Sequence, residues 1–547
     1  MPTRLALAAL ALTAAALPAA AQVARPAALT ADGAPPVPQA LADRTRPYLE
    51  ARSASVQAWN PLDRSLLVTT RFANTAQLHS VAGPLMDRRQ LTFEADRIGS
   101  AHVSKSGDVT VVQKDVGGAE FFQLYTLKDG RLSLLTDGKS RNEFGAFSRD
   151  GRLIGYSSTR RTGADSDLYV MDPRDPATDR LVYQAKGGGW AIQDFSPDGA
   201  RALVQNYVSV QKSDLYELDL ASGKLTPLGD LRKQVAYGGA RYAPDGTLWV
   251  LSDEGSDVQR LGTLARRKFT AVAPDAKWDV EEFDIADDGR FIAYLTNEAG
   301  QSRLKLLDPA TRAVRTAELP QGVAGGLAIA PWGTIALGLS SARVPGDAFT
   351  VDPATLQVTQ WTASETGGLD TARNRDAELI SARSFDGETV SGFLYRPDPA
   401  KFPGKRPLIF NIHGGPEGQS RPGFQGATNY LVNELGIAVF YPNVRGSTGY
   451  GKRFVSLDNG PFKREDSVKD IGAFLDRFAA DPGIDAARIA ETGGSYGGYM
   501  CYASAIRYAG RFKAASCIVA ISSFVTSSKP RVGSLNVPAY GLRRMSR

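Results

Sequence analysis

The chain has few cysteines and histidines, and no long hydrophobic run beyond its first residues. Its 547 residues include two Cys and three His without ligand spacing, which excludes a disulfide scaffold and a Cys-rich zinc site. No Asp, Glu or His follows Ser495, whereas eight of the 64 Lys and Arg residues do. Residues 1–495 therefore hold 56 basic and 58 acidic residues. The high pI comes from the end of the chain, so we expect no nucleic-acid surface, which would need basic residues clustered on a folded face.

The first residues have the layout of an export signal. Arg4 precedes an apolar run from Leu5 to Leu17, and three Ala residues follow at 19–21. This layout predicts a signal peptide over residues 1–21 and a periplasmic or secreted protein, with a buried core helix as the alternative. The run is too short to span a bilayer, so no membrane span is expected. Residues 22–49 are rich in Ala and Pro and are expected to form a flexible lead-in.

A turn signal recurs seven times between residues 50 and 372. The signal is four residues long, and its fourth residue is Gly in most copies. The fourth residues of successive copies are 44, 44, 48, 47, 43 and 44 positions apart. Asp-Gly favours tight hairpin turns. A period of about 45 residues with four short strands per unit predicts a seven-bladed β-propeller, with a stack of unrelated hairpins as the alternative. The seven turns lie at residues 60–63, 104–107, 148–151, 196–199, 243–246, 286–289 and 330–333.

Strands and helices alternate from residue 373 onward. The run 408–412 is apolar throughout, as in a strand that is buried on both faces of a sheet. The alternation predicts an α/β domain with a mostly parallel sheet over residues 373–526. Strands are expected at 378–383, 390–395, 408–412, 437–441, 488–490 and 514–521, and helices at 467–478 and 496–508.

The segment Gly493-Gly494-Ser495-Tyr496-Gly497 joins an expected strand to an expected helix. A Gly-x-Ser-x-Gly pattern in this context fits a nucleophile elbow, a sharp turn that exposes the Ser hydroxyl. Small residues two positions before and after Ser495 permit the tight bend, and the amide of Tyr496 then points at the same spot. Ser495 is therefore the candidate nucleophile, and a plain tight turn is the alternative.

The segment His413-Gly414-Gly415-Pro416 follows the expected strand at 408–412. In hydrolases of this architecture, the loop after that strand supplies the second amide of the oxyanion hole. Such preorganised donors stabilise the charge that develops on the reacting oxygen. We expect His413 itself to be a structural residue that positions the loop, with proton transfer as the alternative.

Arg445 and the two cysteines are the remaining candidates. Arg445 lies in the Gly- and Ser-containing segment 443–451. It is expected to pair with a carboxylate inside the domain, with substrate contact as the alternative. Cys501 and Cys517 fall in the helix after the elbow and in the next strand. Export would permit a disulfide, but we expect two free buried thiols.

These motifs together resemble the prolyl oligopeptidase family of serine peptidases. The propeller units, His413–Pro416, Asn443–Gly451 and Gly493–Tyr499 occur in the family's order over about residues 50–525. In having His at position 413, the chain resembles the acylaminoacyl-peptidase or dipeptidyl-peptidase-like branch of this family. The resemblance implies an α/β-hydrolase capped by a propeller that admits short peptides, without cofactor or metal. It also implies Ser495 as nucleophile and the backbone amides of Tyr496 and Gly415 as the oxyanion hole.

The sequence departs from this family after Ser495. In this fold the order along the chain is Ser, then an acid, then His, and the His takes the Ser proton. Residues 496–547 contain none of Asp, Glu and His, so the triad Asp and His are missing. Loss of a triad His costs a factor on the order of 10⁶ in turnover in one protease. We therefore expect this chain, as written, to be nearly inactive.

The last residues suggest an origin for this departure. From Ser527 the apolar periodicity ends, and residues 527–547 form a basic tail. Our hypothesis is a frameshift or premature stop near residue 526, with a short paralogue kept for binding as the alternative. Missing strands would leave an open sheet edge and lower the solubility. A non-catalytic propeller that binds peptides and an esterase with the same fold remain as alternative functions.

Overall fold

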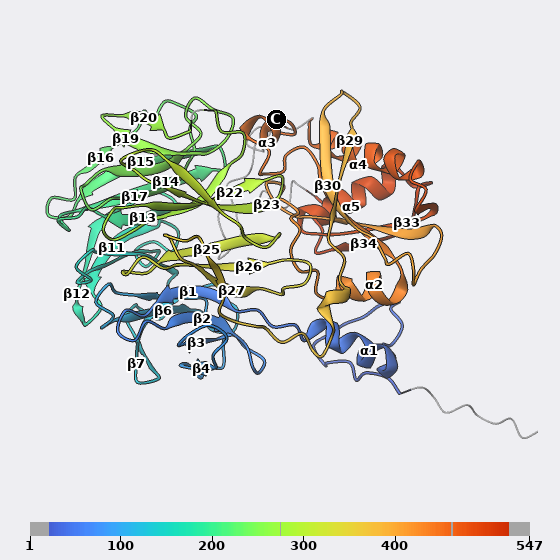
Figure 1. Ribbon diagram of the computed structural model, residues 1–547, viewed down its shortest axis with the longest axis horizontal. Helices are drawn as coiled ribbons and strands as arrows, with labels where there is room; N and C mark the ends of the chain where they lie inside the picture. Colours follow the sequence, from blue (N-terminus) through green and yellow to red (C-terminus); the bar gives the residue numbers. More distant parts are fainter. Residues whose placement is uncertain (1–20, 274, 461–462, 524–547) are drawn as a thin grey trace, which may run out of the picture.

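The protein consists of a β-propeller followed by an α/β unit with a mixed sheet (Figure 1). The computed structural model describes residues 21–273, 275–460 and 463–523. Nearly all of the predicted signal peptide and all of the predicted tail at 527–547 lie outside these residues. Within the described part of the chain, no helix is both long and apolar enough to cross a membrane.

The propeller has seven four-stranded antiparallel sheets, which confirms the predicted number of blades. Blade one contains β1 (Ser55–Trp59), β2 (Leu66–Thr70), β3 (Gln77–Val81) and β4 (Arg88–Gln90), and blade two contains β5 (Ser100–Val103), β6 (Thr110–Lys114), β7 (Gln123–Lys128) and β8 (Arg131–Leu134). Blade three contains β9 (Asn142–Phe147), β10 (Ile154–Ser158), β11 (Asp167–Asp172) and β12 (Asp175–Tyr183), and blade four contains β13 (Trp190–Phe195), β14 (Arg201–Ser209), β15 (Lys212–Asp219) and β16 (Leu225–Pro227). Blade five contains β17 (Tyr237–Tyr242), β18 (Leu248–Ser252), β19 (Arg260–Ala265) and β20 (Lys268–Ala271). Blade six contains β21 (Val280–Ile285), β22 (Ile292–Glu298), β23 (Gln301–Leu307) and β24 (Val314–Ala317), and blade seven contains β25 (Val323–Ile329), β26 (Ile335–Ser340), β27 (Asp347–Val351) and β28 (Val358–Gln360).

Each predicted turn joins the first and second strands of a blade. In blade three, the amide of Gly151 donates to the carbonyl oxygen of Ser148 (2.8 Å), and the Ser148 hydroxyl donates to Asp150 (2.6 Å). Gly151 has a φ of 68°, a conformation that glycine adopts at little cost. The turn therefore closes on its own local hydrogen bonds, which is why its sequence could recur with a constant period.

The α/β unit has one six-stranded sheet in the order β29-β30-β32-β31-β33-β34. The first three strands pair antiparallel, and β32, β31, β33 and β34 pair parallel. The strands are β29 (Glu378–Arg383), β30 (Thr389–Tyr395), β31 (Arg406–Ile412), β32 (Ala438–Asn443), β33 (Ile484–Gly494) and β34 (Phe512–Ile518). The helices are α2 (Thr428–Leu435), α3 (Lys452–Ser456), α4 (Arg464–Ala479) and α5 (Tyr496–Arg507), and η1 (Thr371–Arg373) is a short 3₁₀ turn.

An aromatic cluster forms the core beneath α4. The ring of Phe410 on β31 makes edge-to-face contacts with Phe440, Phe478 and Phe512, at centroid distances of 5.3, 5.7 and 5.8 Å. Such contacts add to the free energy gained by burying the rings. The cluster joins the middle of the sheet to α4 and to the edge strand β34.

The lead-in segment is not flexible throughout, contrary to our expectation. Residues Gln39–Leu49 form α1, which lies beside α2 of the α/β unit (Figure 1). The rings of Tyr48 and Tyr430 are 5.4 Å apart, and the Tyr48 hydroxyl donates to Glu434 (2.8 Å). The Ala- and Pro-rich composition concealed this helix because tertiary contacts rather than helix propensity stabilise it.

Two chain segments connect the propeller to the α/β unit, and they run side by side. Ala51 forms an antiparallel bridge with Thr366, and the amide of Arg52 donates to the carbonyl oxygen of Glu365 (2.8 Å). Further contacts cross the boundary between the units: Arg421 pairs with Glu281 (2.8 Å), and Lys452 lies 3.1 Å from Asp253.

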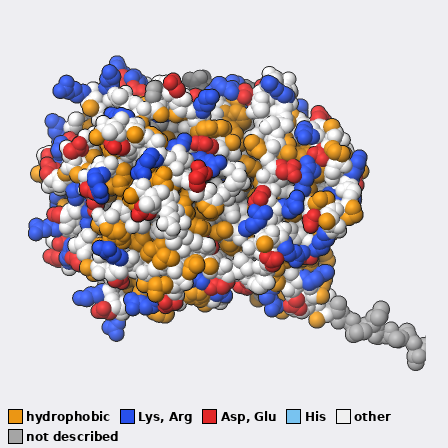
Figure 2. Space-filling model, viewed as in Figure 1, with side chains coloured by type: hydrophobic (Ala, Val, Ile, Leu, Met, Phe, Trp, Pro, Cys, Tyr) orange, Lys and Arg blue, Asp and Glu red, His pale blue; other side chains and the backbone are white. Residues whose placement is uncertain are grey.

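Charges of both signs are mixed on the surface. Figure 2 shows the described Lys and Arg side chains spread among Asp and Glu over one face of the molecule. On this face, charges of opposite sign therefore lie near one another.

Arg445 pairs with carboxylates inside the domain, as predicted. Its guanidinium donates to Asp470 on α4 (2.8 Å) and to Asp386 in the β29–β30 turn (2.8 Å). The side chain of Arg445 is 2% exposed and that of Asp470 is fully buried. The pair ties the loop after β32 to α4.

We expect Arg445→Met to lower the unfolding free energy of the α/β unit by about 3–5 kcal/mol, because it leaves Asp470 buried without its cation. Arg453→Met is the matched control, since Arg453 pairs with Glu388 at the surface and an exposed pair contributes at most about 1 kcal/mol. Hydrogen exchange of the α4 amides in urea measures both changes. Equal losses in the two variants would contradict this assignment.

Candidate active site

Ser495 lies on a sharp bend between β33 and α5. Its φ is 58° and its ψ is −121°, a strained conformation that costs a non-glycine residue about 1–3 kcal/mol. The bend is held from both sides: the amide of Ser495 donates to Ile518 on β34 (3.1 Å), and its carbonyl accepts from Gly498 (3.0 Å). The Ser495 side chain is exposed. The structure thus presents the hydroxyl at the end of the strand, at the start of a helix.

Two glycines allow this bend to pack against β31. A Cβ atom on Gly497 would lie 2.1 Å from the carbonyl oxygen of Ile412, and one on Gly493 would lie 2.3 Å from that of Gly497. Backbone atoms cannot move away from such contacts as a flexible side chain could. By contrast, a Cβ on Gly494 would meet nothing within 4 Å.

The loop after β31 lies against the bend. The Cβ position of Gly414 is 3.4 Å from the Ser495 Cβ and 3.8 Å from the Tyr496 amide nitrogen. Gly415 follows and is exposed. Among the described residues, neither the Gly415 amide nor the Tyr496 amide has a hydrogen-bond acceptor. Unpaired amides beside a nucleophile are the donors that an anionic oxygen needs.

His413 stabilises the same loop. Its Nδ1 lies 2.8 Å from the carbonyl oxygen of Gly414, and its Nε2 lies 3.0 Å from the Ser447 hydroxyl. Because a carbonyl only accepts, Nδ1 carries the proton. The Ser447 hydroxyl lies within hydrogen-bonding distance of both Nε2 and the carbonyl oxygen of Val444 (2.7 Å), and these two acceptors compete for its single proton. Burial lowers the pKa of His413, so the imidazole is neutral at neutral pH. Both ring nitrogens are occupied, and no described side chain hydrogen-bonds to the Ser495 hydroxyl.

Glu491 is a buried acid that the sequence analysis did not single out. It lies on β33, beside Phe410 of β31 and Ala515 of β34 in register, and is 2% exposed. Within the described chain, neither carboxyl oxygen has a hydrogen-bond partner. Burial raises the pKa of Glu491 to about 8. The signal in the sequence was an acidic residue directly after the expected strand at 488–490, four positions before Ser495.

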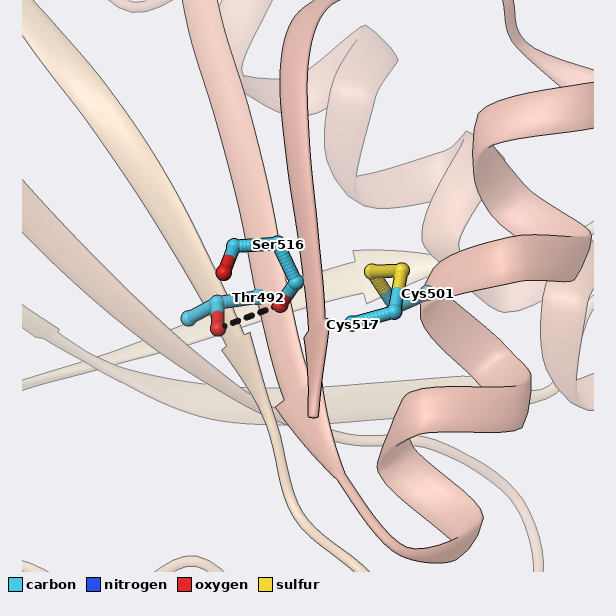
Figure 3. The surroundings of a disulfide bond; sticks show 4 residues. All are labelled: Thr492, Cys501, Ser516 and Cys517. Carbon is cyan, nitrogen blue, oxygen red and sulfur yellow. Dashed lines mark hydrogen bonds between the residues drawn. A yellow bond between two sulfur atoms is a disulfide. The ribbon is translucent and has the colours of Figure 1, made fainter. Parts of the chain in front are cut away.

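Cys501 and Cys517 form a disulfide, so the expectation of two free thiols is wrong. Figure 3 shows the bond between α5 and β34, next to the hydrogen bond from the Thr492 hydroxyl to Ser516. Cys517 and Gly493 are partners in the parallel register, and α5 crosses over them. The two Cα atoms are therefore only 5.6 Å apart, within bonding range. The pairing depends on this packing, which the sequence does not display.

A cavity of about 270 Å³ lies between the propeller and the loop that follows Ser447. The propeller lines it with four acidic residues, and Lys452 lines it from the α/β unit; Ser495 and Gly415 are not among its lining residues. Burial, together with the neighbouring Glu281, Asp257 and Asp253, raises the pKa of Asp279 to about 6. The cavity is thus predominantly acidic. In the described residues, no three His, Cys, Asp or Glu side chains are grouped as a metal site requires.

The comparison with known proteins agrees with this geometry. The model of the prolyl oligopeptidase family matches residues 422–531, which include Ser495. Dipeptidyl-peptidase 5 of Porphyromonas gingivalis is 25% identical over 352 residues, which cover 61% of this chain and 51% of that protein. Dipeptidyl aminopeptidase BIII of Pseudoxanthomonas mexicana is 26% identical over 66% of this chain and 60% of its own length.

The α/β unit of this chain, over residues 422–531, is thus similar to the prolyl oligopeptidase family. An uncharacterized peptidase of Bacillus subtilis is 37% identical to this chain over 149 residues, which cover 27% of this chain and 22% of that protein. The chain thus spans between about a fifth and three fifths of the length of these curated relatives.

Solved structures share the fold of this chain. One from a study of two prolyl endopeptidases has a TM-score of 0.74 at 19% identity, over 87% of this chain and 73% of that chain. A puromycin-hydrolyzing peptidase of Mycobacterium tuberculosis has a TM-score of 0.71 at 18% identity, over 86% of this chain and 78% of that chain. The propeller and the α/β unit therefore occur together in known folds.

We expect Gly497→Ala to destabilise the α/β unit by about 3 kcal/mol, at the upper end for overpacking, because its methyl group would meet fixed backbone atoms. Gly494→Ala is the matched control and should change the unfolding free energy by less than about 1 kcal/mol. Thermal melts of both variants make the comparison. Similar losses would show that the bend does not pack as described.

The raised pKa of Glu491 predicts a pH-dependent stability. The native carboxyl keeps its proton up to about pH 8, whereas the unfolded one loses it near its ordinary pKa of about 4.5, so stability falls as pH rises between these values, by at most about 1.4 kcal/mol per unit. Glu491→Gln should remove this slope, while Glu318→Gln, at an exposed position, should leave it. Melting temperatures from pH 5 to 8 measure it, and an unchanged slope in Glu491→Gln would refute the prediction.

Proposed function

We propose that this chain holds the nucleophile and oxyanion hole of a serine peptidase site for short peptides. Ser495 would attack the peptide carbonyl, and the amides of Tyr496 and Gly415 would bind the oxygen as it becomes negative. Similarity to this family supports the chemistry. The strained, exposed Ser495 next to two unpaired amides supports the assignment of roles.

We further propose that the chain, as given, hydrolyses peptides very slowly. Attack by a Ser hydroxyl requires a base that accepts its proton. The observation that carries this proposal is that no described imidazole reaches Ser495, since His413 hydrogen-bonds to Ser447 and Gly414. Without a base the hydroxyl stays protonated, and only the oxyanion hole would contribute to the rate.

Peptide binding without hydrolysis is the second candidate, and the acidic cavity favours it. The propeller supplies four carboxylates at the boundary with the α/β unit, opposite Lys452. Such a lining would attract the ammonium group of a short peptide. Two relatives that match more than 60% of this chain are named dipeptidyl-peptidase 5 and dipeptidyl aminopeptidase BIII. Their names give a reason to test dipeptide-releasing substrates first.

Export to the periplasm or the medium is part of the proposal. The signal-like start of the sequence supports it. The disulfide between Cys501 and Cys517 supports it as well, because such bonds persist in oxidising compartments.

A fluorophosphonate probe tests the proposed state of Ser495. We expect labelling of the full chain to be no faster than that of surface serines, and peptide and ester turnover to be lower than ordinary enzymatic rates by a factor on the order of 10⁶. Ser495→Ala should change neither. Rapid labelling at Ser495, or peptide hydrolysis at ordinary rates that Ser495→Ala abolishes, would overturn the inactive state. Turnover of esters alone would indicate an esterase.

A further inference from the structure

Three buried nitrogen atoms lie where blade one meets the connecting segments, and none has a hydrogen-bond partner among the described residues. They are Nε of Arg52, Nη1 of Arg88 and Nε2 of His79. His79 is fully buried, and the side chain of Arg88 is only 10% exposed. Buried polar side-chain atoms are paired in the large majority of cases, with protein atoms or with bound water. Three unpaired atoms from neighbouring side chains therefore call for a common partner.

The side chains that carry these atoms are gathered around the ring of Phe72, in the loop between β2 and β3. The Cζ atoms of Arg52 and Arg88 lie 5.9 and 4.7 Å from the centroid of this ring. The centroid of the His79 ring lies 5.0 Å from it. Arg52 is only half-buried, so a small ligand can reach the group from solvent.

The three atoms offer two donors and one acceptor. The guanidinium N–H groups of Arg52 and Arg88 can only donate. In His79, Nδ1 lies 2.9 Å from the carbonyl oxygen of Gln77, and because a carbonyl only accepts, Nδ1 carries the proton. Burial, together with the neighbouring Arg88, lowers the pKa of His79, so the imidazole is neutral at neutral pH and Nε2 is an acceptor. A complementary ligand must therefore accept two hydrogen bonds and donate one.

The charges at this position favour an anion over a water molecule. Arg88 pairs with Glu365, whereas Arg52 forms no ion pair with a described residue. Two guanidinium groups beside one ring repel each other unless an anion offsets their charge. The guanidinium fork fits the oxygens of a carboxylate or a phosphate. Of these two, an ionised carboxylate has no hydrogen to donate to His79, whereas hydrogen phosphate has one.

We propose that Arg52, Arg88 and His79 bind an oxyanion that carries a hydroxyl group, of which hydrogen phosphate is the simplest. The Nε–H of Arg52 and the Nη1–H of Arg88 donate to its oxygens, and its hydroxyl donates to Nε2 of His79. Arg52 lies next to the bridge between Ala51 and Thr366. Arg88 and His79 lie on β4 and β3 of blade one, so the bound anion fastens the first connecting segment to the propeller. Binding does not depend on peptidase activity.

Titration of the full chain with inorganic phosphate, at about pH 7.5 and constant ionic strength, tests this site. We expect saturable binding and slower hydrogen exchange of the Arg52 amide, which donates to the carbonyl oxygen of Glu365. Sulfate has no hydroxyl at this pH and should bind about tenfold more weakly, because it leaves Nε2 of His79 unpaired. Arg52→Lys keeps the charge but loses the Nε–H, and it should weaken phosphate binding by about tenfold as well.

Arg64→Lys provides the matched control. Arg64 is also in blade one and its Cζ also lies over an aromatic ring, 5.2 Å from the centroid of Trp332, but it has no buried unpaired nitrogen. This variant should bind phosphate as the unaltered chain does, and melting temperatures without phosphate show that both variants fold. Three results would overturn the proposal: no saturable phosphate binding, which would leave the three atoms to a water molecule; equal affinities of Arg52→Lys and the unaltered chain; or equal affinities for phosphate and sulfate.

Discussion

The close approach of backbone to backbone at Ser495 is the constraint on which the site depends. Gly493 and Gly497 let the end of β33 and the start of α5 press against the carbonyl of Ile412 at the end of β31. This contact brings the loop after β31 against the bend, where the Cβ position of Gly414 is 3.4 Å from the Ser495 Cβ. The strain in Ser495 persists because hydrogen bonds to two segments, β34 and the first turn of α5, hold its backbone. The backbone geometry at Ser495 thus depends on close packing that only residues without a side chain, Gly493 and Gly497, permit.

Buried charges in the α/β unit follow two different patterns. Arg445 and Asp470 are both buried and satisfy each other with several hydrogen bonds, so their charges are retained. Glu491 is equally buried and has no such partner among the described residues, so it remains neutral. His413 is also neutral, because burial lowers the pKa of its imidazole. The unit therefore contains both a buried ion pair that keeps its charges and buried titratable groups that stay uncharged.

Features encoded by local sequence were predictable, and features created by packing were not. The blade turns close on their own Ser, Asp and Gly atoms, and the bend at Ser495 requires small residues at fixed spacing, so both could be identified from the sequence. Helix α1 owes its order to Tyr430 and Glu434, far along the chain. The disulfide depends on α5 crossing β34. The acidic cavity combines side chains from separate blades with Lys452. None of these long-range partners has a signature in the local sequence.

The paired connection between the two units restricts how they can separate. Helix α1 is anchored on α2, and the strand-like stretch after it is bridged to the stretch that leaves the last blade. The two units are therefore joined by a double tether on one side only. If the two units moved apart, they would rotate about a hinge at residues 51 and 366. Such a rotation would break the contact between Lys452 and Asp253.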